Sequence, residues 1–489
     1  MKKKKILKKS RYIFITLISI IFGLISFYYI DAEAHKPTAE LLEIKKQQTE
    51  ENNYLNAELN VAYDDCINDR TNAKKWHYFI KVLKKRNATD FNYINYNNLI
   101  PIANYIANNY SYFNDIEALK HMTKECERVY NIQRNSFIDD TYAELLFELG
   151  ETQTARKVEA KLKEKKLARI PKHVVTWINN ELAKNTKKPL ANFNSADFFK
   201  EDTATIVGYI DNYNGNQSLN FKTGKIQLEN HFKNSNYPKE VTVLPDGRFK
   251  VKFIINHPIY SKLKLGNNYI NFYIEPGQRL GIINGIRFLN NYNNTLEKNY
   301  IYLGSLSDIN QDLFEFNFKE KNWEQFIKKA KKTNPIDFKK EELFKLNNQL
   351  EKLEIYHNKR NIKDKTYTIL KNKILLDHYI TLLDYPKNHN EQLSSIYTLE
   401  KFKDAQKIIH KSYYGFIKDI NLNSQSLLIN NEFGLFINGL EHDIPGFNLY
   451  VNDPNQTKKW HLTDSIAKSY EINTNDFVYK MIKNRNLKN

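Results

Sequence analysis

The chain has 489 residues, and 74 Lys and Arg outnumber 56 Asp and Glu to give a formal net charge of +18. Hydrophobic residues make up 41% of the sequence and aromatic residues 13%, which excludes a largely disordered chain because so much aromatic surface can form a core. The 15 glycines and 12 prolines are too few for a collagen-like or glycine-linker protein. At roughly 150 residues per domain, the length predicts about three folded units.

The N-terminus combines a basic cluster with an apolar run. Seven basic residues lie between Lys2 and Arg11, and the 19 residues from 12 to 30 carry no charge. A bilayer core takes about 20 apolar helical residues, whereas the apolar region of a signal peptide takes about 7–15. The length therefore favours a retained anchor, but the small residues on either side of Glu33 favour cleavage. Residues 1–34 are predicted to be a signal peptide or signal anchor, and both alternatives place the rest of the chain in the periplasm.

The positive charge outside residues 1–34 does not indicate a particular binding partner. Residues 1–34 carry a net charge of +5, and the other +13 is spread through segments rich in Lys and Asn. A diffuse lysine excess is typical of a solvated surface, and lysine lacks the bidentate geometry with which arginine binds phosphate. We therefore expect no nucleic-acid partner, and the inner membrane, contacted through residues 12–30, is the partner that the charge pattern indicates.

The next part of the chain has a helical pattern. Residues 35–70 are predicted to be a polar helical linker and residues 71–167 a helical domain. Between Thr141 and Leu162, apolar residues recur at spacings of three and four on both sides of Gly150, which should break the helix. This segment resembles one helical hairpin of the tetratricopeptide type.

A linker and a β-rich domain follow. Residues 168–202 contain Pro171 and Pro189 and are predicted to connect two domains. Residues 203–304 contain short alternating segments separated by turns, which predicts an antiparallel β-sandwich. Predicted strands cover residues 204–210, 240–244, 249–255, 260–265, 268–274 and 279–283. Two tight turns are predicted from the residues Pro245, Asp246, Gly247, Glu275, Pro276 and Gly277.

After residue 304 the helical spacing returns, and residues 305–489 are predicted to be a second helical domain. Helices and strands in separate blocks favour a multidomain α+β protein over alternating βαβ units. The predicted order is a membrane helix or signal, a helical repeat-like bundle, an antiparallel β-sandwich and a C-terminal helical domain.

Six phrases in residues 203–488 carry a resemblance to a known family. They are Gly208-Tyr-Ile210, Leu244-Pro-Asp-Gly-Arg-Phe249, Asn256-His-Pro-Ile-Tyr260, Phe272-Tyr-Ile-Glu-Pro-Gly-Gln278, Tyr302-Leu-Gly-Ser-Leu-Ser-Asp-Ile-Asn310 and Glu432-Phe-Gly-Leu-Phe-Ile-Asn438. Their order resembles the N-terminal accessory region of TlpA-type thioredoxin-like proteins of the Gram-negative envelope. The helical block, in Glu117 to Ile132 and around Thr141, is similar to the helical tail of envelope thioredoxin-fold proteins.

The resemblance does not extend to the residues that carry out the family's reaction. In TlpA-type proteins a small β-domain and a helical domain precede a thioredoxin domain with a W-C-x-x-C site. Here no tryptophan adjoins a cysteine, and both cysteines lie outside residues 203–488. Because dithiol exchange needs an activated thiolate beside a resolving cysteine, the resemblance implies the accessory domains without the redox site.

Motifs of other enzymes are also missing from the sequence. It contains no HExxH, GxSxG, GxGxxG or GxxxxGK[ST] motif, so we predict no catalytic residue, no metal ligand and no cofactor. Asp64 and Asp65 are expected on a polar helix face, and Asp139 with Asp140 is expected to cap a helix beginning near Thr141. The tight cluster of residues 441–443, Glu-His-Asp, is expected to be a solvated loop, because consecutive residues do not converge on one point.

Two questions stay open in the sequence. Cys66 and Cys126 either form a disulfide, which the chain-entropy model values at about 4 kcal/mol, or are two buried apolar residues. The aromatic residues Tyr269, Phe272 and Tyr273 are expected in the sandwich core, with a ligand-binding face as the alternative.

We therefore expect an exported, membrane-tethered, non-catalytic binding or scaffold protein of the bacterial envelope. Its expected partners are envelope proteins, among them a thioredoxin-like protein. The alternative is the remnant of a thiol-disulfide oxidoreductase that lost its thioredoxin domain, and the nucleotide sequence after codon 489 would discriminate between the two. A hydrolase without a recognisable motif is the third hypothesis.

Overall fold

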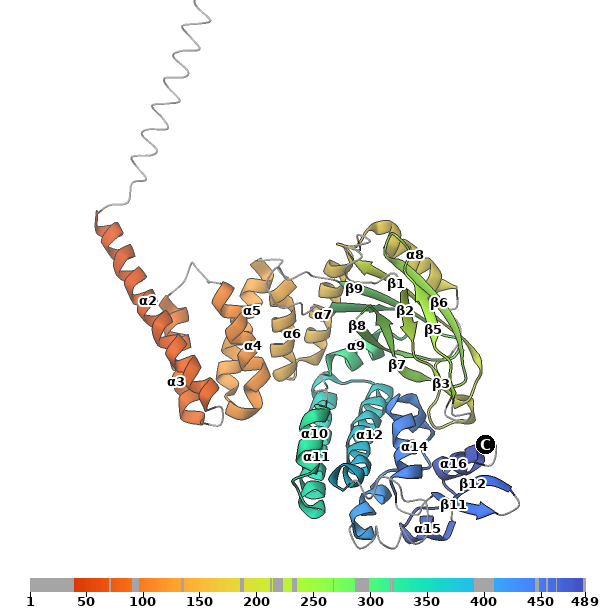
Figure 1. The fold of residues 1–489 in the computed structure, drawn as a ribbon. Helices are drawn as coiled ribbons and strands as arrows, with labels where there is room; N and C mark the ends of the chain where they lie inside the picture. Colours follow the sequence, from red (N-terminus) through yellow and green to blue (C-terminus); the bar gives the residue numbers. More distant parts are fainter. Residues whose placement is uncertain are drawn as a thin grey trace, which may run out of the picture. The chain divides into compact units, whose positions relative to one another are not determined.

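The structure of the chain is a computed structural model that contains both helices and sheets, as the sequence predicts. The chain divides into two compact units, Met1–Glu151 and Thr152–Asn489, drawn from red to orange and from yellow to blue in Figure 1. The structure describes residues 39–69, 72–89, 96–132, 136–184, 189–211, 213, 223–230, 235–266, 268–285, 299–316, 318, 321–390, 409–444, 448–453, 456–462 and 464–486.

The predicted membrane segment, residues 12–30, lies outside the described residues, as does the basic cluster before it. Among the residues that are described, no helix combines the length and the apolar character needed to cross a bilayer. The polar segment predicted to be helical at 35–70 contains α2, which spans Ala39–Asn68.

The described part of the first unit is helical. Its helices are α2, α3 (Ala73–Thr89), α4 (Tyr96–Phe113), α5 (Ile116–Ile132) and α6 (Ser136–Glu148). Each helix packs on the next one along the chain, and α6 also packs on α4. In the core, Trp76 of α3 stacks on Tyr105 of α4 with their ring centroids 5.2 Å apart. Apolar side chains at spacings of three and four make one buried face on α5, which is why this segment forms an amphipathic helix.

Two predictions about α6 have different outcomes. Gly150 ends the helix as expected, because its φ of +78° is a left-handed conformation that glycine adopts without strain. The predicted cap at Asp139 and Asp140 is wrong: α6 begins at Ser136, so both residues lie inside its first turns, and Asp139 is fully buried. The start was misplaced because Ser136 and the two following apolar residues extend the same helical pattern toward the N-terminus.

The β part of the second unit contains two four-stranded sheets. The first has the order β10-β9-β1-β6 and the second the order β5-β2-β7-β8. Strands of the first sheet are β1 (Asp202–Asp211), β6 (Arg248–Ile255), β9 (Arg279–Gly285) and β10 (Asn299–Leu303). Strands of the second are β2 (Thr223–Ile226), β5 (Lys239–Thr242), β7 (Ile259–Leu265) and β8 (Asn268–Ile274). A separate two-stranded sheet consists of β3 (Glu229–Asn230) and β4 (Ser235–Asn236).

The prediction of a wholly antiparallel arrangement is wrong at one pair. β1 runs antiparallel to β6 but parallel to β9. The cause is the turn after β8: it carries the chain from the second sheet to the first, so β9 enters beside β1 instead of forming a hairpin with β8. The strands predicted from alternation are present, whereas β2 and β10 were not predicted.

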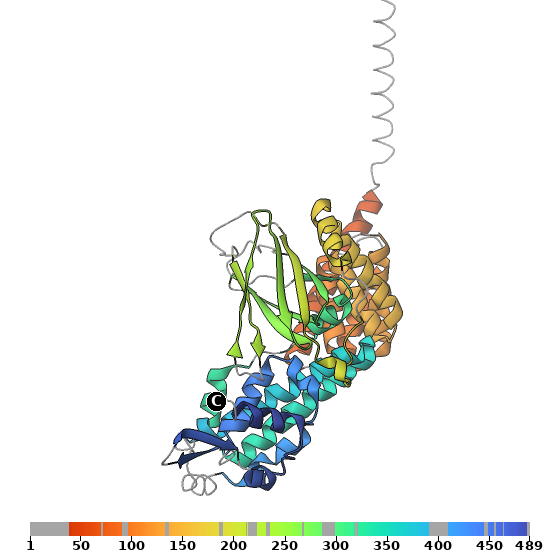
Figure 2. The same cartoon turned by 90° about the vertical axis from the view of Figure 1, so that its right-hand side faces the viewer.

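One apolar core extends from between the sheets into the helices. Along β6, buried and exposed residues alternate, with Phe249, Val251 and Phe253 facing inward as their spacing predicts. These side chains belong to the same buried cluster as Phe272 of β8 and Leu428 of the helical part. In Figure 2 the sheets lie above the C-terminal helices, which are drawn in cyan and blue.

The segment predicted as a linker, residues 168–202, contains the helix α8 (Lys172–Ala183). Val174 and Ile178 of α8 pack against the outer face of the first sheet. Gly281 of β9 makes this approach possible, because a Cβ there would lie 3.1 Å from Ile178 and 2.9 Å from Leu303. The prolines that suggested a linker lie outside the helix, where they do not interrupt its hydrogen bonds.

The C-terminal part of the second unit is mainly helical, as predicted. Its helices are α9 (Ser307–Glu315), α10 (Trp323–Ala330), α11 (Pro335–Arg360), α12 (Asp364–His389), α14 (Glu432–His442), α15 (Asp464–Ser469) and α16 (Phe477–Asn486), with 3₁₀ helices η4 (Lys411–Asp419) and η5 (Gln425–Ile429). A hairpin of β11 (Asn448–Asp453) and β12 (Gln456–Leu462) interrupts this series, so the expectation of an all-helical C-terminal domain is wrong there.

Helix α7 (Thr152–Leu167) is joined to the C-terminal helices by ion pairs. Arg156 lies 2.8 Å from Asp312 of α9, and Glu159 lies 2.9 Å from Arg360 of α11. The sequence placed this helix in the block 71–167, and the structure assigns it to the second compact unit.

Candidate functional site: a cleft between sheet and helices

A cleft of about 1080 Å³ separates the edge of the β part from the C-terminal helices. Strands β7, β8 and β10 supply one side, and helices α9 to α12 with α14 supply the other. This volume is at the upper end of the range for ligand-binding pockets in proteins. A cleft of this size has room for a ligand, and it is the candidate site described below.

Aromatic side chains dominate the apolar lining of the cleft. They are Tyr260, Tyr269, Tyr300, Phe314, Phe316, Phe318, Trp323, Phe326 and Phe338. Most are partly or fully buried, but Tyr269 is 52% exposed and Trp323 is 47% exposed. Leu435 of α14, 58% exposed, also lines the cleft. An aromatic lining with exposed apolar groups is typical of surfaces that bind another molecule.

The start of α10 fixes the position of Trp323. The side chain of Asn322 caps the helix by accepting a hydrogen bond from the backbone N–H of Gln325 at 3.0 Å. Trp323 is then the first helical residue, and Lys321 directly precedes the cap. A local sequence signal therefore places a tryptophan and a lysine together on the helical side of the cleft.

The edge of β8 at the cleft is partly closed by side chains. The amide of Asn310, on α9, accepts from the backbone N–H of Tyr273 at 2.6 Å and donates to its carbonyl at 2.9 Å. The hydroxyl of Tyr302, on β10, donates to the carbonyl of Asn271 at 2.8 Å. These bonds satisfy one end of the strand edge, which would otherwise present free pairing groups.

Lys373 is the centre of one partly buried charge cluster in the cleft. Its ammonium lies 2.5 Å from Glu432 and 3.1 Å from Asp377. Burial alone would lower the pKa of Lys373, but the two carboxylates outweigh it and raise the pKa. Because Lys373 and Asp377 are on α12 and Glu432 is on α14, this cluster also holds two helices together.

Glu342 is the centre of a second cluster. Its carboxylate lies 2.7 Å from Nδ1 of His378 and 3.2 Å from Lys345. Burial raises the pKa of Glu342, but the partners His378 and Lys345 outweigh it, so the pKa is below its usual value. The carboxylate is therefore held ionised and already bonded, which does not suit a general base.

Lys321 has a different environment from these paired groups. Its ammonium lies 3.8 Å from the ring centroids of both Trp323 and Phe326 and donates a hydrogen bond of 2.9 Å to the hydroxyl of Thr381. Burial lowers the pKa of Lys321 to about 8. An amine on aromatic faces, with part of its charge desolvated, is well suited to attract an anionic group.

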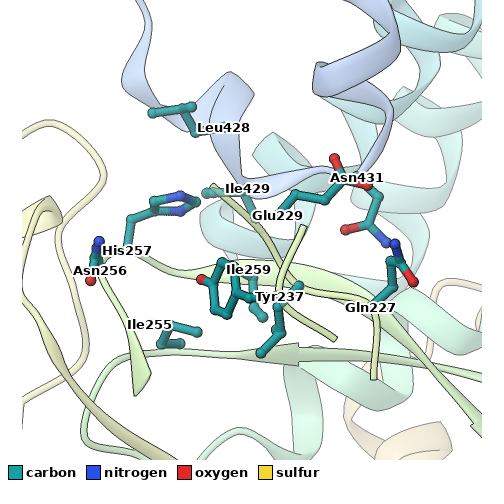
Figure 3. A pocket seen from close by; sticks show the side chains of 11 residues that line it. Gln227, Glu229, Tyr237, Ile255, Asn256, His257, Ile259, Leu428, Ile429 and Asn431 are labelled. Carbon is teal, nitrogen blue, oxygen red and sulfur yellow. The ribbon is translucent and has the colours of Figure 1, made fainter. Parts of the chain in front are cut away.

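A second pocket, on the other side of the same junction, is much smaller. Its volume of about 20 Å³ holds roughly one water molecule. Figure 3 shows the side chains that line it, with His257 and Tyr237 from the β part and Leu428 and Ile429 from the η5 segment. The His257 ring stacks on Phe198, and its Nδ1 lies 2.8 Å from the carbonyl of Pro258. This arrangement is that of a buried packing residue.

The two cysteines are not part of the cleft. Cys66 lies on α2 and Cys126 on α5, and both are buried free thiols, so the disulfide that the sequence left open is not formed in the structure. Their helices have different neighbours: α2 packs on α3, whereas α5 packs on α4 and α6. Burial raises the pKa of Cys66 to about 11 and that of Cys126 to about 12.

The predicted turn residues lie in turns. Gly247 and Gly277 have φ values of +84° and +75°, which explains glycine at both positions. Asp246 accepts from the backbone N–H of Arg248 and forms an ion pair with its side chain. Glu275 is almost fully buried and binds Lys365 of α12 at 2.7 Å, so its turn anchors the sheets to the helices.

The acidic residues that the sequence singled out have structural roles. Asp64 and Asp65 are exposed on α2, as expected. Residues 441–443 were expected to form a solvated loop, and this is wrong: Glu441 is buried at the end of α14, and Asp443 lies 3.0 Å from Lys387 of α12. Burial raises the pKa of Asp443 to about 6. Within the described part of the chain, no group of three or more His, Cys, Asp and Glu side chains is placed to bind a metal ion.

The residues of the cleft were missed in the sequence, apart from Tyr269. Phe272 and Tyr273 are buried in the core as expected, but Tyr269 faces the cleft. One signal was available: Phe314, Phe316 and Phe318 are followed shortly by Trp323, which is a denser aromatic run than a helix core requires. No protein-family model, curated protein or solved structure matches the chain.

Proposed function

We propose that this chain is a non-catalytic binding protein whose cleft holds a polypeptide segment of a partner. The observation that carries the proposal is the aromatic cleft with its exposed side chains Tyr269 and Trp323. Rigid aromatic groups are enriched at protein–protein interfaces and supply a large share of the binding energy there. The paired carboxylates of the cleft support binding over acid–base catalysis, because they are already committed to neighbouring cations.

The proposal includes a location in the bacterial envelope. The basic cluster and the apolar residues 12–30 support export with a membrane tether. The finer architecture belongs to the same proposal: a tetratricopeptide-like bundle in the first unit, a β-sandwich, and a helical domain similar to the accessory region of TlpA-type proteins. The expected partners are envelope proteins, among them a thioredoxin-like protein.

The state of the cysteines supports a role other than thiol-disulfide exchange. The reactive species in that exchange is the thiolate, and a pKa of about 11 or 12 leaves very little thiolate at neutral pH. Both thiols are also buried, which denies them access to a protein disulfide. We expect no insulin reduction above that of a Cys66→Ala/Cys126→Ala variant, and thiol-dependent turnover by the full chain would refute the non-catalytic assignment.

Selection from random dodecapeptides displayed on phage tests the binding site itself. The full chain should select peptides that bind a Tyr269→Ala/Trp323→Ala variant at least tenfold more weakly. The matched control is Tyr54→Ala/Phe344→Ala, because these two aromatic residues are 65% and 64% exposed and do not line the cleft. If no selected peptide distinguishes the two double variants, the cleft is not a peptide-binding site.

A further inference from the structure

The charges that line the cleft are not balanced locally. Each of its carboxylates has a cation partner: Glu315 with Arg360, Glu342 with Lys345, and both Asp377 and Glu432 with Lys373. Its lysines Lys329 and Lys345 pair with Glu341. Lys262 and Lys321, by contrast, have no carboxylate partner among the described residues. The cleft therefore presents two ammonium groups without a direct ion pair on an aromatic surface, and the carboxylates of Asp384, Glu342 and Asp377 act on Lys321 only from beyond contact distance.

Lys321 is held in place without being neutralised. The Thr381 hydroxyl accepts one of its three N–H groups, and the same hydroxyl donates to the carbonyl of Asp377 at 2.8 Å, so its proton is directed away from the amine. Trp323 and Phe326 contact the ammonium through their ring faces. These contacts position the amine but provide much less charge compensation than a carboxylate does.

Lys262 lies on the opposite side of the cleft. It is an exposed residue of β7, and its register partner on β8 is Asn271, which also lines the cleft. A segment lying between the strands and α10 would therefore meet an ammonium from each side. Charge complementarity selects an anionic ligand, and the aromatic lining of the cleft selects one that also offers apolar surface.

We propose that the occupant of the cleft is an acidic peptide segment, one of whose carboxylates binds the Lys321 ammonium while its apolar side chains pack on the aromatic lining. This inference rests on the proposed function and specifies the chemistry of the partner. The carboxylate supplies the ion pair that Lys321 lacks, in a site where aromatic walls exclude part of the solvent and strengthen the attraction.

A peptide array tests this assignment with the full chain. Each dodecapeptide with blocked ends is printed twice, once with two Glu or Asp residues and once with Gln or Asn at the same positions. Binding is compared for wild type, Lys321→Gln, Lys321→Arg and Trp323→Ala. The matched control is Lys340→Gln, because Lys340 is exposed on α11 and does not line the cleft. Thermal unfolding of each variant confirms that it is folded.

Wild type and Lys340→Gln should bind acidic peptides at least tenfold more tightly than their amide twins. Lys321→Gln should lose this preference, and Lys321→Arg should keep it. If wild type binds the acidic peptides and their amide twins equally, and Trp323→Ala loses this binding, the preference for an acidic peptide is wrong and the proposed peptide cleft still holds. A preference for acidic peptides that survives in Lys321→Gln would overturn the role of Lys321. Absence of any signal that depends on Trp323 would overturn both proposals.

Discussion

The junction between the sheets and the C-terminal helices has two sides that differ in almost every respect. On one side, polar and apolar residues around His257 leave a pocket of about 20 Å³, space for roughly one water molecule. On the other, a cleft of about 1080 Å³ keeps aromatic side chains exposed and holds two lysines that form no ion pair with the described residues. Asn431, at the start of α14, lines both. The same elements thus build a small pocket on one side and a large cleft on the other, and the cleft is the one that holds exposed aromatic side chains.

The largest effect that would test this comparison is expected at the paired charges of the cleft. Lys373→Met should lower the free energy of unfolding by about 3–5 kcal/mol, because the Glu432 carboxylate, whose side chain is 16% exposed, would remain largely buried without its cation. Urea unfolding measures the change, and Lys340→Met is the control. A loss below about 1 kcal/mol would show that the Glu432 carboxylate is solvated in solution and does not need the cation.

A pair of aliphatic truncations compares the two sides directly. Ile429→Ala, at the small pocket, should cost about 2–5 kcal/mol because the residue is 1% exposed and its removal leaves a cavity. Leu435→Ala, at the cleft, should change stability by less than about 0.5 kcal/mol because the residue is 58% exposed. Similar costs for both in urea unfolding would mean that the cleft is closed in solution.

Replacing Lys321 should stabilise the protein, whereas replacing Lys373 should destabilise it. Its pKa is lowered by burial from 10.5 to about 8, so between pH 8 and 10.5 the unfolded state binds more protons and stability should rise with pH. The charged groups that face it are Glu342 and Lys345 of α11 and Asp377 and Asp384 of α12. Lys321→Met should therefore be about 1–2 kcal/mol more stable than wild type at pH 7, because one pKa unit corresponds to roughly 1.4 kcal/mol and solvent screens part of it.

The difference in the free energy of unfolding between Lys321→Met and wild type should shrink as the pH approaches 10. Urea unfolding at pH 7 and at pH 9.5 measures this change. A Lys321→Met variant that is less stable than wild type at pH 7 would contradict the assignment, because it would mean that the ammonium has a stabilising partner in the unbound protein.

The smallest expected effect concerns binding near neutral pH. The affinity of an acidic peptide should fall by about threefold to tenfold between pH 7 and 9 as the Lys321 ammonium loses its proton. Lys321→Arg should not show this fall, because a guanidinium stays protonated throughout this range. Fluorescence anisotropy with one labelled acidic peptide is sufficient, and an identical pH profile in the two proteins would exclude Lys321 as the titrating contact.

Local patterns predicted the elements more reliably than their pairing. The alternation in residues 249–255 predicted β6, and Gly150 predicted the end of α6, because both features depend only on nearby residues. The parallel pairing of β1 with β9 was not predictable in this way. It depends on a turn that changes sheets, and a turn sequence specifies its own dihedral angles but not which strand receives the chain. For the same reason α8 was overlooked: its packing partner is a sheet formed by distant strands.

The candidate site shows most clearly what could not be predicted from the sequence. By itself, the sequence determined a mixed helical and β architecture, the two glycine turns and the lack of a dithiol motif, since these follow from composition and short-range spacing. Only the tertiary structure decided which charges are compensated. Lys321 and Lys373 are both lysines in aromatic, helical surroundings, and what separates them is that Lys373 meets Glu432 from α14 whereas Lys321 meets a hydroxyl and two rings. Ion pairing decays over a few ångströms, so it depends on how distant segments come together, which spacing along the chain does not specify.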